Sequence, residues 1–372
     1  MTEQSQIPVT VLTGYLGAGK TTLLNRVLTE DHGKKYAVIV NEFGEIGIDN
    51  DLVVGADEEI FEMNNGCICC TVRGDLIRII GGLLKRKDKF DAILVETTGL
   101  ADPAPVAQTF FTDDDVKKRT KLDSIVTVVD AKHIDQRLDD SDEAEEQIAF
   151  ADIILLNKTD LVTPDALANV EAHIKKLNPF AKIYRTQRSN IALDKILDRG
   201  AFDLKRALEL DPHFLCDHEH GHHHHDHHDD HDHHGHDHHD HGHAHHHHDH
   251  HGDGRSPSID ARAPGARVGS PIHDTDIHSV SLATEKPLDQ QKFDAWVNEV
   301  LMTDGQRILR TKGILNMKGA DERFVFQAVH MVSEGTFTGP WPSKDNRRSR
   351  LVFIGRELDE ATLKAGFEST IA

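Results

Sequence analysis

The chain has few cysteines, few aromatic side chains and no long apolar run. Its 372 residues include four cysteines, three of them clustered, which is too few for a disulfide framework and indicates a reducing compartment. No segment approaches the ~20 apolar residues that span a bilayer. The N-terminal residues 1–6 lack the basic and apolar regions of a secretory signal. We therefore expect a cytoplasmic protein.

An excess of positive charge is also missing. The formal net charge is −21, which argues against duplex DNA or an anionic membrane as a partner. We expect no nucleic acid and no membrane among the partners, whereas cations, including metal ions, suit such a surface. At ~150 residues per domain, the length predicts about two domains.

A phosphate-binding loop follows the first apolar segment. The strand-like Val9–Thr13 leads into a G-x-x-x-x-G-K-T motif and then a helical pattern, which is the context that the motif requires. In such loops backbone N–H groups face the phosphates, the lysine reaches the β and γ phosphates, and the hydroxyl binds Mg²⁺. Lys20 is thus also a catalytic candidate, and Thr21 a Mg²⁺ ligand. The predicted nucleotide-binding residues are Gly14, Tyr15, Leu16, Gly17, Ala18, Gly19, Lys20, Thr21 and Thr22.

A second motif indicates which base is bound. An apolar strand ends in an N-K-x-D segment, the arrangement in which a carboxylate accepts protons from guanine. We expect Asn157, Lys158 and Asp160 to hold the base, so that GTP is favoured over ATP. An ordinary strand-to-helix loop, with Asp160 as a turn former, is the alternative.

Three acids are candidates for Mg²⁺ binding and catalysis. Glu96 ends an apolar strand before a glycine turn, where a loop that senses the γ-phosphate would lie. Glu42 and Asp49 belong to a glycine-containing segment, 41–49, that is typical of a first switch. We predict Glu96 and Asp49 on Mg²⁺ or its waters, Glu96 also as a catalytic residue, and Glu42 in water positioning or metal transfer. Solvated loop carboxylates are the alternative.

Cys67, Cys69 and Cys70 form a C-x-C-C cluster between the phosphate loop and Glu96. Thiolates select Zn, Cu(I) or Fe–S centres over Mg and Ca, and three of them can reach one tetrahedral ion. The preceding Asn-Asn-Gly indicates a turn. We predict a soft-metal site with a fourth position left for water or another group. Three buried thiols that pack as small hydrophobes are the alternative.

A histidine-rich segment separates two halves of the chain. Between His218 and His251 lie twenty-two of the twenty-nine histidines and eight acids, without Lys or Arg. Such a segment cannot bury a core, so we expect disorder without metal. Imidazoles bind Zn, Co, Ni and Cu with little choice among them. We interpret the segment as a metal collector; a passive linker and an engineered tag are the alternatives. Its longest runs are His222, His223, His224, His225, and His245, His246, His247, His248.

Regular periodicity returns after residue 273. Residues 277–282, 306–315, 324–332 and 350–354 read as strands, and helices are expected around 293–301 and 359–367. We expect the aromatic residues of the first helix to lie in a core, and His330, placed on a strand, to be structural. The predicted domains are an α/β P-loop domain with a mostly parallel sheet over 1–200, a linker over 201–272, and a small α+β domain over 273–372.

With these motifs in this order, the sequence resembles the CobW family of metal-handling P-loop GTPases. Its motifs are more similar to those of the zinc-associated branch than to those of the members that serve cobalamin synthesis. The resemblance implies Zn²⁺ or a similar ion on the C-x-C-C cysteines, slow GTP hydrolysis, and delivery of the metal to the apo-form of a client protein. The first hypothesis is a GTP-dependent metallochaperone with GTP, Mg²⁺ and Zn²⁺ (or Co²⁺) as ligands.

Other functions stay open at the level of the sequence. A metal-storage protein with nucleotide-tuned affinity, a cobalt-handling protein of cobalamin biosynthesis, and a regulatory GTPase whose cysteines sense redox state are the alternatives. The client, the physiological metal and the oligomeric state, including a homo-oligomer, are not determined by the sequence.

Overall fold

The computed structural model describes residues 6–41, 60–63, 70–85, 90–202, 277–341 and 347–372. The described parts of residues 1–216 and 274–372 belong to one compact unit. The predictions on Glu42, Asp49, Cys67, Cys69 and the histidine-rich segment lie outside the described residues.

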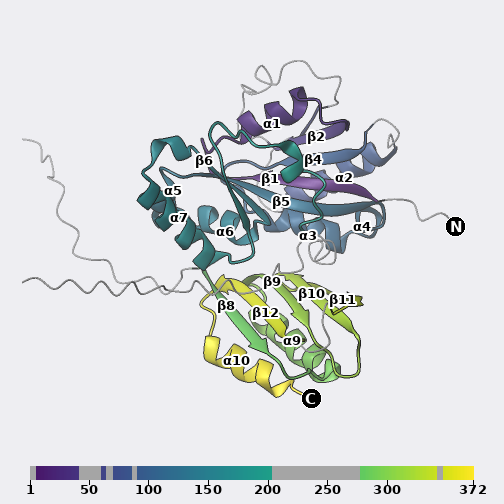
Figure 1. The fold of residues 1–372 in the computed structure, drawn as a ribbon. Helices are drawn as coiled ribbons and strands as arrows, with labels where there is room; N and C mark the ends of the chain where they lie inside the picture. The colour runs from purple at the N-terminus through teal and green to yellow at the C-terminus, as the bar shows by residue number, and fades with distance from the viewer. Residues whose placement is uncertain (1–5, 42–59, 64–69, 86–89, 203–276, 342–346) are drawn as a thin grey trace, which may run out of the picture. The chain divides into compact units, whose positions relative to one another are not determined.

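The N-terminal part is built on a seven-stranded sheet in which neighbouring strands are parallel (Figure 1). The strand order is β3-β2-β4-β1-β5-β6-β7. Every residue of β4 and β6 is buried, as expected of parallel strands that are covered on both faces. The strands are β1 (Ile7–Thr13), β2 (Tyr36–Asn41), β3 (Ile60–Met63), β4 (Ala92–Glu96), β5 (Thr120–Asp130), β6 (Ile153–Asn157) and β7 (Lys182–Arg185).

Helices cover both faces of this sheet. The apolar side of α1 packs with residues 191–197 on one face, and α2, α3, α6 and α7 pack on the other. The strands supply both cores by alternation, because Val9 and Val11 of β1 face one cluster and Leu12 the other. The helices are α1 (Lys20–Thr29), α2 (Cys70–Leu83), α3 (Ala104–Thr112), α4 (Asp114–Arg119), α5 (Ile134–Asp140), α6 (Asp142–Phe150) and α7 (Pro164–Leu177), with short 3₁₀ segments η2 (Thr159–Leu161) and η3 (Leu193–Lys195).

The C-terminal part is a five-stranded antiparallel sheet of order β11-β10-β9-β12-β8. Its helices α9 and α10 pack into one aromatic core, in which Phe293 is fully buried and Trp296 contacts Phe353 and Phe367. The expected core role of the aromatic residues is therefore confirmed. The elements are β8 (Ile277–Thr284), α9 (Gln290–Asp304), β9 (Ile308–Leu315), β10 (Glu322–Val329), β11 (Val332–Pro340), β12 (Ser349–Arg356) and α10 (Glu360–Ser369).

The predicted fold class is confirmed, but one predicted strand is wrong. The apolar run 324–332 is divided by a tight turn at His330 and Met331, and the chain returns as β11. His330 therefore lies in a turn and not on a strand, with φ 51° and its Nδ1 3.1 Å from the carbonyl oxygen of Gly305. The sequence did not reveal the turn because it contains no Gly, Pro, Asn or Asp.

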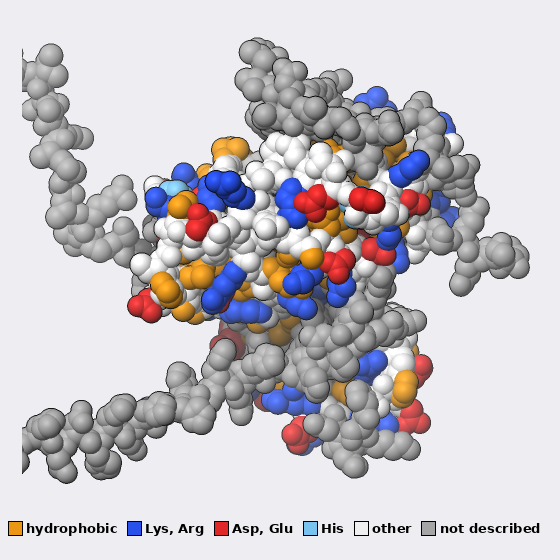
Figure 2. Space-filling view, turned by 45° about the horizontal axis from the view of Figure 1, so that its top comes forward, with side chains coloured by type: hydrophobic (Ala, Val, Ile, Leu, Met, Phe, Trp, Pro, Cys, Tyr) orange, Lys and Arg blue, Asp and Glu red, His pale blue; other side chains and the backbone are white. Residues whose placement is uncertain are grey.

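Charged side chains of both signs lie interspersed on the face drawn in Figure 2. Among the described residues, no helix combines the length and the apolar character needed to cross a bilayer.

Candidate nucleotide-binding site

The phosphate loop joins the end of β1 to the start of α1. Gly14, Gly17 and Gly19 all have positive φ, which glycine adopts without steric cost. The Lys20 side chain is buried, and its Nζ donates to the carbonyl oxygens of Gly14 (2.7 Å) and Tyr15 (3.3 Å). The ammonium group is thus held inside the loop, where a nucleotide's phosphates need it. Thr21 and Thr22 follow in the first turn of α1.

Asn157 links the base motif to the phosphate loop. Its buried side chain donates from Nδ2 to the carbonyl oxygen of Ala18 (2.9 Å), and its Oδ1 accepts from the backbone N–H of Ser189 (2.8 Å). The next residue, Lys158, has φ 61°, and Asp160 is exposed in η2. The structure therefore brings Asn157 against the loop and leaves the Asp160 carboxylate accessible to a ligand.

Ser189 belongs to neither sequence motif but contacts the phosphate loop. It is fully buried with φ 53°, and its Oγ donates to the carbonyl oxygen of Gly19 (3.0 Å). The turn 186–190 therefore supports the phosphate loop at Gly19, next to the contact that Asn157 makes with Ala18. A polar cluster directly after β7 was the available signal, because ligands of parallel sheets bind at the carboxyl ends of the strands.

The loop after β4 lies against the phosphate loop. Glu96 is buried at the end of β4, and the N–H of Thr97 donates to Leu12 of β1 (2.9 Å). Gln147 of α6, which is also buried, donates from Nε2 to the carbonyl oxygens of Gly99 (3.1 Å) and Ala101 (3.2 Å). The position of Glu96 at the end of β4 is compatible with its predicted contact with Mg²⁺. Gln147, like Ser189, was not identified from the sequence.

The cysteine cluster is only partly described. Cys70 is the first residue of α2, so a helix begins at the last of the three cysteines. Cys67 and Cys69 lie outside the described residues. Within the described ranges, no three His, Cys, Asp or Glu side chains gather in a way that could hold a metal ion.

A pair of acids lies beside the loop after β4. Burial, reinforced by the nearby carboxyl group of Asp102, raises the pKa of Glu146 to about 7, although Arg356 opposes the shift from 3.1 Å. Burial likewise raises the pKa of Asp102, against a hydrogen bond from the N–H of Ala104. Glu146 is therefore partly protonated near neutral pH.

Replacing Glu146 with glutamine should change how stability depends on pH. The folded-state pKa lies above the ordinary 4.5, so the folded wild-type protein loses stability as pH rises from 4.5 to about 7. Glutamine cannot ionise, so the melting temperature of the variant relative to wild type should be higher at about pH 8 than at about pH 5. The exposed Asp135→Asn serves as the control. The same difference at both pH values would contradict the expectation.

The fold and the loop together define a class of protein. A glycine-rich loop between a parallel strand and a helix, with a lysine ammonium held inside it, is the site of a P-loop nucleotide-binding protein. The comparisons with known proteins agree with this class. Residues 8–185 match the family model described as CobW/HypB/UreG, nucleotide-binding domain, and residues 277–371 match the cobalamin synthesis protein cobW C-terminal domain. The chain belongs to the CobW family of P-loop GTPases.

Relatives within this family are named for zinc. The chain is 30% identical to the zinc chaperone YjiA of Escherichia coli (strain K12), over 97% of this chain and 98% of that protein. It is 44% identical to zinc-regulated GTPase metalloprotein activator 1 of Schizosaccharomyces pombe, over 55% and 52% of the two chains. The crystal structure of Zn(II)-bound YjiA GTPase aligns with a TM-score of 0.68 at 26% identity, covering 99% of this chain and 100% of that one.

Proposed function

We propose that this protein is a GTP-dependent metallochaperone. It binds Zn²⁺ or Co²⁺ through Cys67, Cys69 and Cys70, and GTP binding and hydrolysis gate the transfer of the metal to the apo-form of a client metalloprotein. The observation that carries the proposal is the position of β3 in the sheet. Its carboxyl end, from which the chain continues toward the cysteines, lies at the same edge as the phosphate loop, because β3, β2, β4 and β1 are parallel neighbours.

Different residues around the phosphate loop bind the phosphates, the base and the Mg²⁺ ion of GTP. Lys20 binds the β and γ phosphates, and Asn157, Lys158 and Asp160 hold the guanine base. Thr21, Asp49 and Glu96 would hold Mg²⁺, which neutralises charge on the phosphates when bound. The buried position of Glu96 beside the start of the phosphate loop supports this assignment.

The route from nucleotide to metal runs through the sheet edge. α2 begins at Cys70, and the strand before the cysteines, β3, pairs with β2, which in turn pairs with β4. A movement of the start of α2 on GTP binding would shift the thiolates and alter their metal affinity. Such coupling is reciprocal, so the metal would alter the affinity for GTP by the same factor.

The experiment that tests the proposal measures metal affinity in two nucleotide states. A variant that lacks residues 217–252 removes the competing histidines; Zn²⁺ and Co²⁺ affinity is then determined by competition with a chelator, with GDP and with a non-hydrolysable GTP analogue. We expect the two states to differ by tenfold or more, ~1.4 kcal/mol of coupling.

Two control variants separate the parts of this proposal. Replacing Cys67, Cys69 and Cys70 with serine should abolish the high-affinity site, and Lys20→Ala should remove the nucleotide dependence while the metal still binds. Equal metal affinities with GDP and with the GTP analogue would contradict the gating mechanism and favour metal storage or redox sensing.

A further inference from the structure

Asp130 lies where the carboxyl ends of β5 and β6 meet, next to the N-K-x-D segment. It is the last residue of β5 and lies in register with Asn157, the last residue of β6. The N–H of Ala131 donates to the carbonyl oxygen of Asn157 (2.9 Å), so the two strand ends are joined directly. Lys158, the residue after Asn157, consequently emerges beside Asp130.

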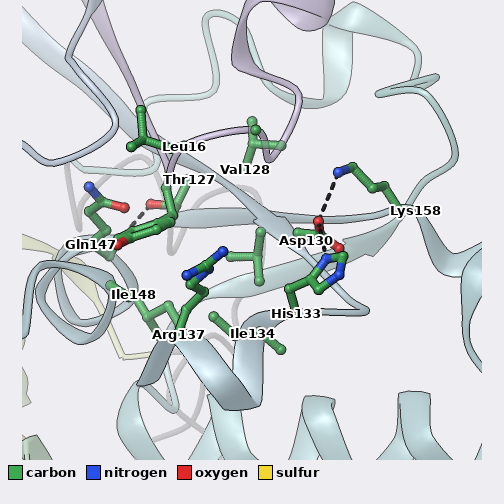
Figure 3. A pocket seen from close by; sticks show the side chains of 14 residues that line it. Leu16, Thr127, Val128, Asp130, His133, Ile134, Arg137, Gln147, Ile148 and Lys158 are labelled. Carbon is green, nitrogen blue, oxygen red and sulfur yellow. Dashed lines mark hydrogen bonds and ion pairs between the residues drawn. The ribbon is translucent and has the colours of Figure 1, made fainter. Parts of the chain in front are cut away.

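The Asp130 carboxylate has three donors (Figure 3). Its Oδ2 accepts from Nζ of Lys158 at 2.8 Å and lies 2.9 Å from Nδ1 of His133, and its Oδ1 accepts from the N–H of Lys132 at 3.0 Å. Burial opposes ionisation of Asp130, but these partners outweigh it and lower the pKa below 3.8. The carboxylate is therefore charged at neutral pH and holds the lysine ammonium.

The held lysine forms part of a cavity beside the phosphate loop. The cavity measures about 230 Å³, and Tyr15, Leu16 and Gly17 of the loop line it together with Asp130 and Lys158. Figure 3 shows the Lys158 side chain reaching from its own turn toward Asp130. The backbone of Lys158 is left-handed, with φ 61°.

Holding a lysine side chain in one conformation has an entropic cost, which the binding energy of a ligand must otherwise offset. The ion pair with Asp130, at 2.8 Å, restricts the Lys158 side chain from within the protein and so lowers the part of this cost that falls on the ligand. We propose that Asp130 is a positioning residue for guanine nucleotides: it fixes Lys158 of the N-K-x-D segment in the conformation that receives the base. The inference rests on the proposed function, in which Asn157, Lys158 and Asp160 bind guanine.

The test is a double-mutant cycle on the full-length protein, with a fluorescent GDP analogue as the probe. Asp130→Ala should weaken GDP binding about tenfold, and Lys158→Met should weaken it by a similar factor. The double variant should bind no more weakly than Lys158→Met alone, because Asp130 acts through the lysine. Asp130→Asn, which keeps an acceptor but loses the charge, should give an intermediate loss and replaces Asp130→Ala in the cycle if that variant does not fold.

A matched control distinguishes positioning from general damage. Asp135 lies on α5, is exposed, and pairs with His173 at 3.5 Å, so Asp135→Ala should leave GDP affinity unchanged. A purely structural role for Asp130 would instead give losses that add to those of Lys158→Met. Additive losses, or an unchanged affinity in Asp130→Ala, would overturn the inference.

A separate variant tests the proposed function on which the inference depends. Asp160→Asn should remove the preference for GDP over IDP, which lacks the 2-amino group, whereas Asp130→Ala should weaken both nucleotides alike. If Asp160→Asn leaves that preference intact, guanine recognition by this motif fails. If Asp160→Asn removes the preference for GDP over IDP, but the losses of Asp130→Ala and Lys158→Met are additive, only the role of Asp130 fails.

Discussion

Replacing Asp152 with alanine should lower the free energy of unfolding by about 3–5 kcal/mol, because the change leaves two buried cations without their anion. The side chains of Asp152, Arg310 and Lys312 are each at most 2% exposed. Oδ1 of Asp152 accepts from Arg310 and, at 2.8 Å, from Lys312, and Oδ2 accepts from the N–H of Ile125 at 2.8 Å. Urea denaturation at about pH 7 measures the loss.

Further contacts explain how the single carboxylate of Asp152 accommodates both Arg310 and Lys312. These three residues form the buried charge cluster. Arg310 also donates to the carbonyl oxygen of Phe150, and Lys312 to that of Ala201 at 3.3 Å. The ring of Phe202 lies 4.9 Å from the Arg310 guanidinium carbon, which partly offsets the remaining positive charge. These contacts join the start of β6 to β9 within one compact unit.

The pH dependence of the same cluster has a definite sign. Burial opposes ionisation of Asp152, but Arg310 and Lys312 outweigh it, so the folded-state pKa lies below 3.8. The stabilisation is therefore fully present above that value and is lost as pH falls through the folded-state pKa.

Two further variants test the assignment of this loss. Asp152→Asn should be less damaging than alanine because it still accepts from Ile125. A triple variant, Asp152→Leu with Arg310→Met and Lys312→Met, should recover most of the stability, since apolar replacements of buried ion clusters are often neutral. A loss of less than about 1 kcal/mol for alanine, the value of a surface pair, would contradict the buried arrangement.

Local motifs made the nucleotide site predictable. The phosphate loop and the N-K-x-D segment are contiguous in sequence, so their context of strand, loop and helix could be checked without knowing the fold. The roles assigned to Lys20, Asn157 and Asp160 stay predictions. Ser189 and Gln147 escaped notice because each acts on a segment that is distant in sequence, through a backbone carbonyl that has no sequence signature.

The buried charge cluster of Asp152, Arg310 and Lys312 could not be predicted from the sequence. Asp152 precedes an apolar strand and looks like a solvated residue at a strand start. Arg310 and Lys312 are two residues apart, so they share one face of their strand, as exposed residues would. Only the packing of β9 reveals that these three charges are buried together. The β10–β11 turn was missed for a related reason, since tertiary contacts around His330, and not a turn-forming residue, hold its left-handed backbone.

Replacing Gly14 with alanine should abolish nucleotide binding, with at least a hundredfold loss of GDP affinity, and should destabilise the fold by roughly 2–4 kcal/mol. Gly14 has φ 140°, and a Cβ there would lie 2.2 Å from the carbonyl oxygen of Val128 in β5. A backbone atom of a buried central strand cannot move aside, so the loop itself must shift. Lys20 would then lose the carbonyl oxygen of Gly14 that holds its ammonium.

Gly17 provides the matched control within the same loop. Its φ is 74°, but a Cβ at Gly17 would meet no atom within 4 Å, so Gly17→Ala carries only the backbone strain of about 1–2 kcal/mol. Equilibrium titration with GDP and thermal denaturation of both variants separate the clash from the strain. We expect Gly17→Ala to keep measurable GDP affinity and Gly14→Ala to lose it. Equal effects at the two positions would show that strain, and not the contact with β5, sets the geometry of the loop.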